Sequence, residues 1–145
     1  MFLGEYRHSI DAKGRLAIPA RFRGELGEGL VVTRGLDRCL SIYPQSEWEP
    51  LAERLSSLPV SEPAVRALRR TFFTGAFACE MDKQGRILIP SALREYAGLD
   101  GEVVIAGLNT YIEIWSGENW EQELPRVEAG ASSLAEQLSN LGIAF

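Results

Sequence analysis

The feature that most constrains this chain is a nine-residue pattern that occurs twice. Residues 11–19 and 82–90 both read Asp-x-x-Gly-Arg, followed by three apolar residues and a proline. The similarity between the two copies continues to Trp48 and Trp120, with an offset that changes by one residue in the loop before residue 31. A repeat of this length is a whole small folding unit rather than one turn of a solenoid. The chain is therefore a duplicated module.

Each copy of the pattern predicts a β-hairpin with an arginine beside its turn. An aspartate at the first position and a glycine at the fourth are typical of a type I turn, in which the carboxylate accepts backbone N–H groups and the glycine takes a positive φ. The period-2 alternation of the following strand turns its apolar residues inward and leaves Arg15 and Arg86 on the outer face. Asp11 and Asp82, four residues before these arginines, are placed to brace them. The turn glycines are Gly14 and Gly85, and the inward residues are Leu16, Ile18, Ile87 and Ile89.

The chain length bounds how the two modules can fold. One repeat of roughly 50 residues buries a poor fraction of its surface, so we expect the two copies in these 145 residues to share one core. The mixture of β-rich runs and capped helical stretches predicts an α+β fold. We expect a first repeat over residues 5–48, a helical connector over 49–75, a second repeat over 77–120 and a helical tail over 121–145.

The predicted elements follow from periodicity and from helix start and stop signals. The apolar spacing of Leu134, Leu138 and Leu141 predicts a last amphipathic helix over residues 131–145. Strands are predicted over residues 6–10, 15–18, 30–33, 39–43, 77–81, 86–89, 103–106 and 111–115, and further helices after Pro19, Pro44, Ser61, Pro90 and Ser116.

Charge is distributed unevenly along the chain, whose net charge is −5. Residues 1–24 carry five basic and two acidic residues, and residues 66–94 carry six and two. Residues 25–65 carry three basic and seven acidic residues, and residues 95–145 carry one and nine. Positive charge thus gathers around both patterns, and a local basic patch matters more for phosphate binding than the net charge does. A merely solvated surface with uneven charge is the alternative.

The sequence offers little for catalysis or for binding a metal or cofactor. His8 is the sole imidazole, and no Walker-type glycine-rich loop is present. Cys39 and Cys79 lack a Cys/His set around them and are predicted to be buried thiols. We expect no enzyme activity, no metal, no cofactor and no small-molecule substrate. No apolar run approaches the roughly 18 residues of a membrane span, so we expect a cytosolic protein without a membrane partner.

Double-stranded DNA is the partner that these residue types favour. The planar fork of arginine matches phosphate oxygens and the O6/N7 edge of guanine. A two-stranded ribbon is narrow enough to enter a major groove. Two such hairpins in one chain would give two readers, and an oligomer would multiply weak contacts into avidity.

The chain also resembles a known family. The resemblance rests on the opening Met-Phe-Leu-Gly-Glu-Tyr-Arg-His-Ser-Ile-Asp, on both Asp-x-x-x-Arg motifs, on Gly-Arg-(Leu/Ile)-x-Ile-Pro in each copy, and on residues 72–76 and 107–115. In these features the chain is similar to the MraZ family, a two-repeat branch of the SpoVT-AbrB superfamily. The resemblance implies two tandem SpoVT-AbrB-like repeats that form an interlocked swapped-hairpin β-barrel flanked by helices, and a ring-like homo-oligomer. It further implies a transcriptional regulator that binds short repeated DNA boxes upstream of its own division and cell-wall operon and associates with the nucleoid.

Carried over to this sequence, the resemblance implies that Arg15 and Arg86 contact DNA and that Asp11 and Asp82 orient them. Neighbouring cations are expected to contact phosphate, and we rank the first repeat ahead for base contact because more of these cations cluster there. They are Lys13, Lys83, Arg7, Arg21 and Arg23.

Two alternatives to this interpretation stay open. In the first, the chain is a homo-oligomeric assembly module without DNA, in which the basic patch pairs with the acidic half of the next subunit. In the second, it is an antitoxin-like DNA binder, which would carry a disordered tail that wraps a toxin.

Overall fold

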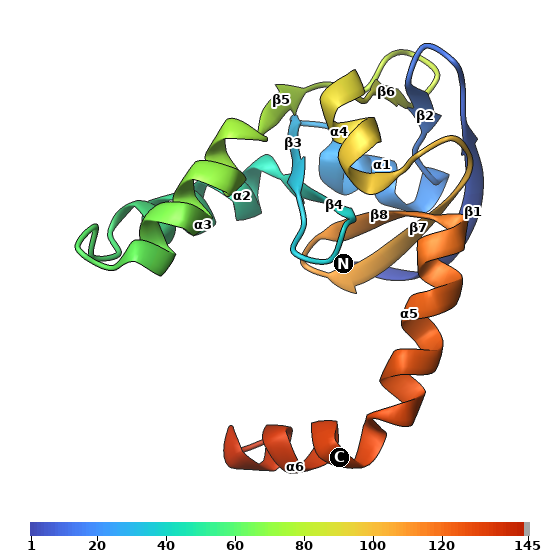
Figure 1. Cartoon of the computed structure of the whole chain (residues 1–145). Coiled ribbons are helices and arrows are strands. Elements are labelled where there is room, and N and C mark those ends of the chain that lie inside the picture. The colour runs from blue at the N-terminus through green and yellow to red at the C-terminus, as the bar shows by residue number, and fades with distance from the viewer. Residues whose placement is uncertain (144–145) are drawn as a thin grey trace.

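Eight antiparallel strands form one sheet that curls into a nearly closed barrel, and two helical arms extend from it (Figure 1). The computed structural model describes residues 1–143. The strand order in the sheet is β5-β3-β4-β8-β7-β1-β2-β6. In chain order the elements are β1 (Phe2–Ile10), β2 (Arg15–Ala17), α1 (Ala20–Leu26), β3 (Leu30–Arg34), β4 (Leu40–Pro44), α2 (Gln45–Ser56), α3 (Pro63–Thr74), β5 (Phe77–Cys79), β6 (Arg86–Leu88), α4 (Ser91–Ala97), β7 (Gly101–Asn109), β8 (Ile112–Ser116), α5 (Gly117–Ala129) and α6 (Ala131–Asn140).

Most strands pair with a strand of the other repeat. β1 pairs with β7 from Phe2↔Asn109 to Ile10↔Gly101, β2 pairs with β6, β3 with β5, and β4 with β8. Exchanging β1–β4 for β5–β8 maps this pairing onto itself, so a pseudo-two-fold axis relates the repeats. Each repeat completes the sheet of the other, which confirms the predicted α+β fold of interlocked repeats.

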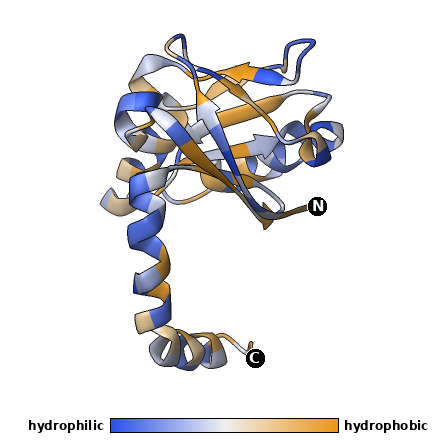
Figure 2. Cartoon of the chain, turned by 90° about the vertical axis from the view of Figure 1, so that its right-hand side faces the viewer, coloured by the Kyte–Doolittle hydropathy of each residue, from blue (hydrophilic) through white to orange (hydrophobic). Residues whose placement is uncertain are grey.

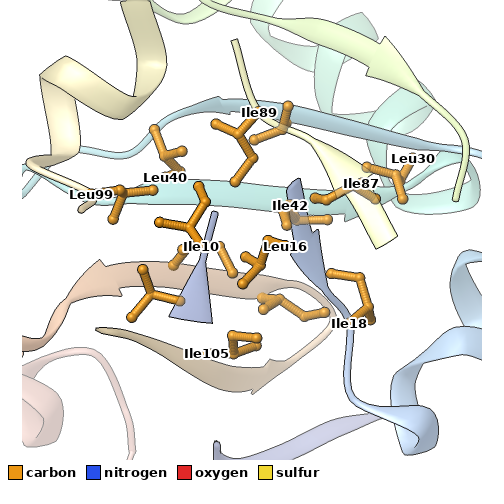
Figure 3. Close-up of a cluster of buried hydrophobic side chains, with 14 of the residues drawn as sticks. Ile10, Leu16, Ile18, Leu30, Leu40, Ile42, Ile87, Ile89, Leu99 and Ile105 are labelled. Carbon is orange, nitrogen blue, oxygen red and sulfur yellow. The ribbon is translucent and has the colours of Figure 1, made fainter. Parts of the chain in front are cut away.

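The two repeats share one hydrophobic core, as the chain length predicted. Figure 3 shows inward side chains of both repeats pointing toward one another. Burying one such aliphatic side chain stabilises a fold by about 1.5–3 kcal/mol, so each copy of the pattern stabilises the whole barrel. The pattern contributes Leu16, Ile18, Ile87 and Ile89, each at most 1% exposed.

Two equivalent helices, α1 and α4, cover the barrel and follow the prolines of the two patterns. Phe22 and Leu26 of α1 and Leu93 and Ala97 of α4 are buried in the shared core. These helices bring the end of each pattern back against the sheet. They therefore lie next to the two turns, which occupy the top of the barrel in Figure 1.

The other four helices form two arms. α2 and α3 lie side by side, and Trp48 of α2 stacks on Phe72 of α3 with ring centroids 5.3 Å apart (Figure 1). α5 leaves the barrel after β8, where Trp120 packs edge-on against Trp115. None of these four helices contains a fully buried residue. The arms thus carry half-exposed apolar faces, and Figure 2 shows orange segments along α5 and α6.

Two strands are longer than the sequence predicts. β1 begins at Phe2 rather than at residue 6, and β7 spans Gly101–Asn109 rather than residues 103–106. The two strands pair with each other along their whole length. Hydrogen bonds between segments about 100 residues apart leave no local signal, so periodicity within either segment underestimates its length.

Two predictions, one for a side chain and one for the tail, are wrong in part. Cys79 is half-buried rather than buried. The last helix ends at Asn140 because Gly142 takes a φ of +82°, which leaves Leu141 beyond the helix and 76% exposed. Residues 144–145 of the predicted helix lie outside the described residues.

Candidate nucleic-acid interface

The first turn is organised by its own aspartate. The N–H of Gly14 donates to the carbonyl oxygen of Asp11 at 3.0 Å and closes a β-turn, with Gly14 at a φ of +87°. Oδ1 of Asp11 accepts from the backbone N–H groups of Lys13 at 3.0 Å and Arg15 at 2.9 Å. Oδ2 accepts from Nε of Arg15 at 2.6 Å. One carboxylate thus holds both the turn and the guanidinium, as the sequence predicts.

The second turn repeats this geometry. The N–H of Gly85 donates to the carbonyl oxygen of Asp82 at 3.0 Å. Oδ1 of Asp82 accepts from the backbone N–H groups of Gln84 and Arg86, both at 2.9 Å, and Oδ2 accepts from Nε of Arg86 at 2.9 Å. The pattern therefore specifies the same local structure in both repeats.

Both arginines project from one face of one ribbon. β2 pairs with β6 in the register Arg15↔Leu88 and Ala17↔Arg86, and the pair between them is the buried Leu16↔Ile87. Directly opposite residues share a face, so the two arginines form a diagonal pair whose Cα atoms are roughly 7–8 Å apart. The two turns do not act as separate hairpins, because they join into one two-stranded ribbon drawn from both repeats.

The guanidinium groups of Arg15 and Arg86 are each hydrogen-bonded to an aspartate through Nε. Arg15 and Arg86 have side chains that are 39% and 33% exposed. Each uses Nε on its aspartate, and within residues 1–143 neither Nη1 nor Nη2 of either arginine donates a hydrogen bond. Two terminal donors of each group therefore remain for an external acceptor.

Hydrogen bonding lowers the pKa of both aspartates below its usual value. At Asp11 the largest cause is the backbone N–H of Arg15, and at Asp82 it is the backbone N–H of Arg86. The guanidinium of the same arginine adds to each effect. Both aspartates are consequently ionised at neutral pH and act purely as acceptors.

The other predicted cations fall into distinct environments. Lys13 and Lys83 are exposed in the two turns, and Arg21 is exposed on α1. Arg7 projects from β1 into a group of carboxylates, and Arg23 on α1 is half-buried with Nε 2.8 Å from the carbonyl oxygen of Ile18. The structure therefore places Lys13 and Lys83 in the same turns as Arg15 and Arg86, whereas Arg7 and Arg23 are engaged within the protein.

Arg7 is bound by three acidic side chains. Its Nη1 donates to Glu102 at 2.9 Å, and its Nη2 donates to Glu121 at 2.8 Å and to Glu5 at 3.4 Å. Hydrogen bonds to Glu121 and, next, to Glu102 raise the pKa of Arg7. A guanidinium whose terminal donors already face three carboxylates is poorly placed to bind phosphate.

Arg94 is a basic residue of this region that the sequence reasoning missed. It lies on α4, 71 residues after Arg23, and its Nε donates to the carbonyl oxygen of Ile89 at 3.0 Å, as Nε of Arg23 does to Ile18. Aligning the helices of the two repeats would have shown the equivalence. The pattern itself ends at Pro90, before this position.

The sole imidazole makes a contact within the sheet. Nδ1 of His8, the sole imidazole, is 2.7 Å from the carbonyl oxygen of Ala17, so the ring bridges β1 and β2. Within residues 1–143 no group of three or more His, Cys, Asp and Glu side chains is arranged to hold a metal ion. In the same span, no helix combines the length and apolar character needed to traverse a bilayer.

The fold and the two turns define a class of protein. It is a pseudo-two-fold β-barrel made of two interlocked copies of one module, with an aspartate-braced arginine from each copy on a shared ribbon.

Comparison with known proteins identifies the family. Residues 1–71 and 72–140 each match the family model described as that of the MraZ protein, which is called antitoxin-like. A protein of Desulfitobacterium hafniense is 53% identical over 143 residues, covering 99% of this chain and all of its own, and one of Roseiflexus castenholzii is 55% identical over 141 residues, covering 97% and 99%. A protein of Desulforamulus reducens is 52% identical over 141 residues, again covering 97% and 99%, and all three are named transcriptional regulator MraZ. The chain belongs to the MraZ family, as the motifs indicated.

Proposed function

We propose that this chain is a DNA-binding transcriptional regulator that reads duplex DNA with Arg15 and Arg86. The observation that carries the proposal is the ribbon of β2 and β6, on which two aspartate-braced guanidinium groups share one outer face. The names of the similar proteins support the same function. The chain is not proposed to be an enzyme.

The geometry suits base recognition in a major groove. A two-stranded ribbon fits that groove, and an arginine can donate two hydrogen bonds to O6 and N7 of guanine. Because the aspartate holds Nε, the rotation of each guanidinium is restricted, and its terminal nitrogens are left available to a base. The diagonal separation of roughly 7–8 Å between the arginine Cα atoms is about two base-pair steps of 3.4 Å. The ribbon would therefore contact two base pairs that lie two steps apart, with both arginines at once.

The lysines of the turns extend the interface to the phosphates. Lys13 and Lys83 are exposed beside the reading arginines, and lysine binds phosphate as a flexible point charge. Arg21 on α1 is a further exposed cation of the first repeat. These residues would add affinity and salt dependence rather than sequence preference.

The target and setting follow from the resemblance and are part of the proposal. We propose short repeated DNA boxes upstream of the chain's own division and cell-wall operon as the site, and a cytoplasmic, nucleoid-associated location. We also propose a homo-oligomer that presents several ribbons to the repeated boxes. The half-exposed apolar faces of the arms support an oligomer, because Leu124, Val127 and Leu134 are each at least 40% exposed.

Titration of a labelled duplex tests the proposal. The duplex comes from the region immediately upstream of the chain's own coding sequence, and the control is a shuffled duplex of equal length. We expect tight binding to the first duplex, with log K falling by about 0.9 per neutralised phosphate for each tenfold increase in salt. Equal, weak binding to both duplexes at low salt would refute sequence-specific recognition.

A DNA-independent assembly module is the second candidate. It is favoured by the separation between the basic residues 66–94 and the acidic residues 95–145, which could pair between subunits. Light scattering over a salt series separates the two candidates. Under the assembly candidate, salt dissociates the oligomer and duplex DNA has little affinity. Under the DNA-binding proposal, salt weakens DNA binding while the oligomer, held by apolar contacts, persists.

The antitoxin-like candidate makes a different prediction about the tail. It requires a disordered segment that wraps a toxin. In the part of the tail that the structure describes, α5 and α6 are helical. This observation favours the regulator.

A further inference from the structure

Two arginines outside the ribbon occupy equivalent positions in the two repeats. Arg23 on α1 donates from Nε to the carbonyl oxygen of Ile18 at 2.8 Å, and Arg94 on α4 donates from Nε to that of Ile89 at 3.0 Å. Both arginines are half-buried. The same contact in both repeats indicates a role in the architecture that α1 and α4 share.

Each of these arginines lies against the turn of the other repeat. A Cβ placed on Gly14 would be 2.8 Å from Nε and 3.0 Å from Cζ of Arg94, and a Cβ placed on Gly85 would be 2.9 Å from Cδ of Arg23. Nε and Cζ of Arg23 lie closer still to that position on Gly85. Both glycines are buried, so each guanidinium packs directly on the backbone of the opposite turn.

Backbone hydrogen bonds connect the same groups. The N–H of Ile89 donates to the carbonyl oxygen of Gly14 at 2.8 Å, and the carbonyl of Ile89 in turn accepts from Arg94. The N–H of Ile18 donates to the carbonyl oxygen of Gly85 at 2.9 Å, and the carbonyl of Ile18 accepts from Arg23. Each turn is therefore attached to a peptide of the other repeat, and that peptide is held by an arginine.

We propose that Arg94 is a positioning residue for the turn that carries Arg15, and that Arg23 is a positioning residue for the turn that carries Arg86. Each reading arginine is thus held by the aspartate of its own repeat and, through the turn backbone, by an arginine of the other repeat. The contribution to DNA reading rests on the proposed function, whereas the crossed attachment of the turns does not.

The competing role for Arg23 and Arg94 is direct contact with phosphate. Both roles need a positive side chain near the turns, but they differ in geometry. A phosphate contact that depends on positive charge can also be made by lysine, which binds phosphate as a point charge. A positioning contact requires the Nε donor and the planar group that packs on glycine, which lysine lacks.

Amide hydrogen exchange on the free chain tests the crossed attachment without DNA. The probes are the backbone amides of Arg15 and Arg86, which are bonded to equivalent carboxylates. Arg94→Ala should accelerate exchange at Arg15 by roughly 3- to 10-fold, the range of one net hydrogen bond, and leave Arg86 within about 2-fold. Arg23→Ala should do the reverse. Arg94→Lys and Arg23→Lys, which keep the charge and much of the packing, should show the same crossed pattern. Equal acceleration at both turns, or none at either, would overturn the proposal.

Coupling in DNA binding tests the consequence for reading. Arg94→Ala should weaken binding to the upstream duplex by roughly 3- to 10-fold in the Arg86→Ala background, but by less than about 2-fold in the Arg15→Ala background, because the positioned group is then gone. Equal losses in the two backgrounds, rescued by Arg94→Lys, would assign a phosphate contact and overturn the positioning role. Failure of the unaltered chain to bind any duplex would refute the proposed function instead, and the exchange measurement would still decide the crossed attachment.

Discussion

The two Asp-x-x-Gly-Arg turns have almost the same structure but different surroundings. In both turns one carboxylate accepts two backbone N–H groups at 2.9–3.0 Å and the Nε of the following arginine. The glycines at the fourth position both have positive φ values, +87° and +74°. The shared residues of the pattern thus specify the backbone and the brace, and they leave other positions free to vary.

The variable positions set the electrostatics of each turn. The first turn carries Lys13 where the second carries Gln84, and the second carries Lys83 where the first carries Ala12. On the ribbon, Arg15 faces the exposed Leu88, whereas Arg86 faces the small Ala17. The two turns therefore share their backbone geometry and differ in the position of one charge and one apolar side chain. Under the DNA-binding proposal, they need not contact the same bases.

The largest expected effect is the loss of DNA affinity when Arg15 and Arg86, the proposed base-contacting residues, are replaced. Arg15→Ala and Arg86→Ala should each lower affinity for the upstream duplex by roughly 10- to 100-fold, as expected for a bidentate arginine–base contact. The double variant should bind the upstream duplex no more tightly than it binds a shuffled duplex. We expect the larger single loss for Arg15, and fluorescence anisotropy of the labelled duplex measures it.

The thermal midpoint of unfolding is the control for these variants. Because both side chains project outward from the barrel, the midpoint should stay near that of the unaltered chain. A larger loss for Arg86→Ala than for Arg15→Ala would reverse the ranking of the two repeats. Unchanged DNA affinity in the double variant would show that the ribbon is not the DNA interface.

The second prediction replaces a lysine in each turn by the residue found at the equivalent position of the other turn. Lys13→Gln introduces the residue found at the equivalent position of the second turn, and Lys83→Ala introduces that of the first turn, so both backbones should persist. If each lysine neutralises one phosphate, each variant should reduce the slope of log K against log salt by about 0.9. The slope is measured by anisotropy at four or more salt concentrations. An unchanged slope for one variant would show that only the other lysine meets the DNA backbone.

Local and non-local features differ in how far the sequence predicts them. The turns, the inward faces of Leu16 and Ile87, and the braces of Arg15 and Arg86 depend on residues within five positions, so pattern and turn chemistry suffice. The environment of Arg7 depends on Glu102 and Glu121, which lie about 100 residues away in the sequence. No local pattern shows such a contact.

The close approach of β1 and β7 is another non-local feature. A Cβ on Gly107 would be 2.6 Å from the backbone nitrogen of Leu3, so this position of β7 has no room for a side chain. The sequence predicts strands only over residues 103–106 and 111–115 of this segment. In the structure β7 continues to Asn109, and Gly107 pairs with Gly4 of the other repeat where the two backbones approach closely.

A smaller effect concerns protonation of the braces. Because hydrogen bonds lower the folded-state pKa of Asp11 and Asp82 below 3.8, their stabilising contribution is present above that pH and is lost as pH falls through the folded pKa. The backbone N–H is the largest cause, so Arg15→Ala should leave the pKa of Asp11 below 3.8 while raising it relative to the unaltered chain. Carboxyl carbon chemical shifts followed by NMR between pH 2 and pH 6, a range chosen around the ordinary value, measure both midpoints.

Asp82 in the Arg15→Ala variant is the internal control for this titration. Its midpoint should not change, since its own backbone donor and guanidinium are intact. If Asp11 returned fully to 3.8 in Arg15→Ala, the guanidinium rather than the backbone would be the main cause of the shift. The carboxylate of Asp11 would then be stabilised chiefly by the guanidinium of Arg15 and not by the backbone of its own turn.

The smallest expected effect distinguishes Arg7 from the other basic residues of the first repeat. Its terminal nitrogens donate to three carboxylates, so the local charge around it is negative and Arg7→Ala should change DNA affinity by less than about 2-fold, with an unchanged salt slope. Arg21→Ala is the matched comparison, because Arg21 is an exposed arginine of the same repeat, and it should reduce the slope by up to about 0.9 if it meets a phosphate. A slope reduction in Arg7→Ala equal to that in Arg21→Ala would mean that the carboxylates release Arg7 when DNA binds. The first repeat would then present a wider basic face to the duplex than the structure of the free chain shows.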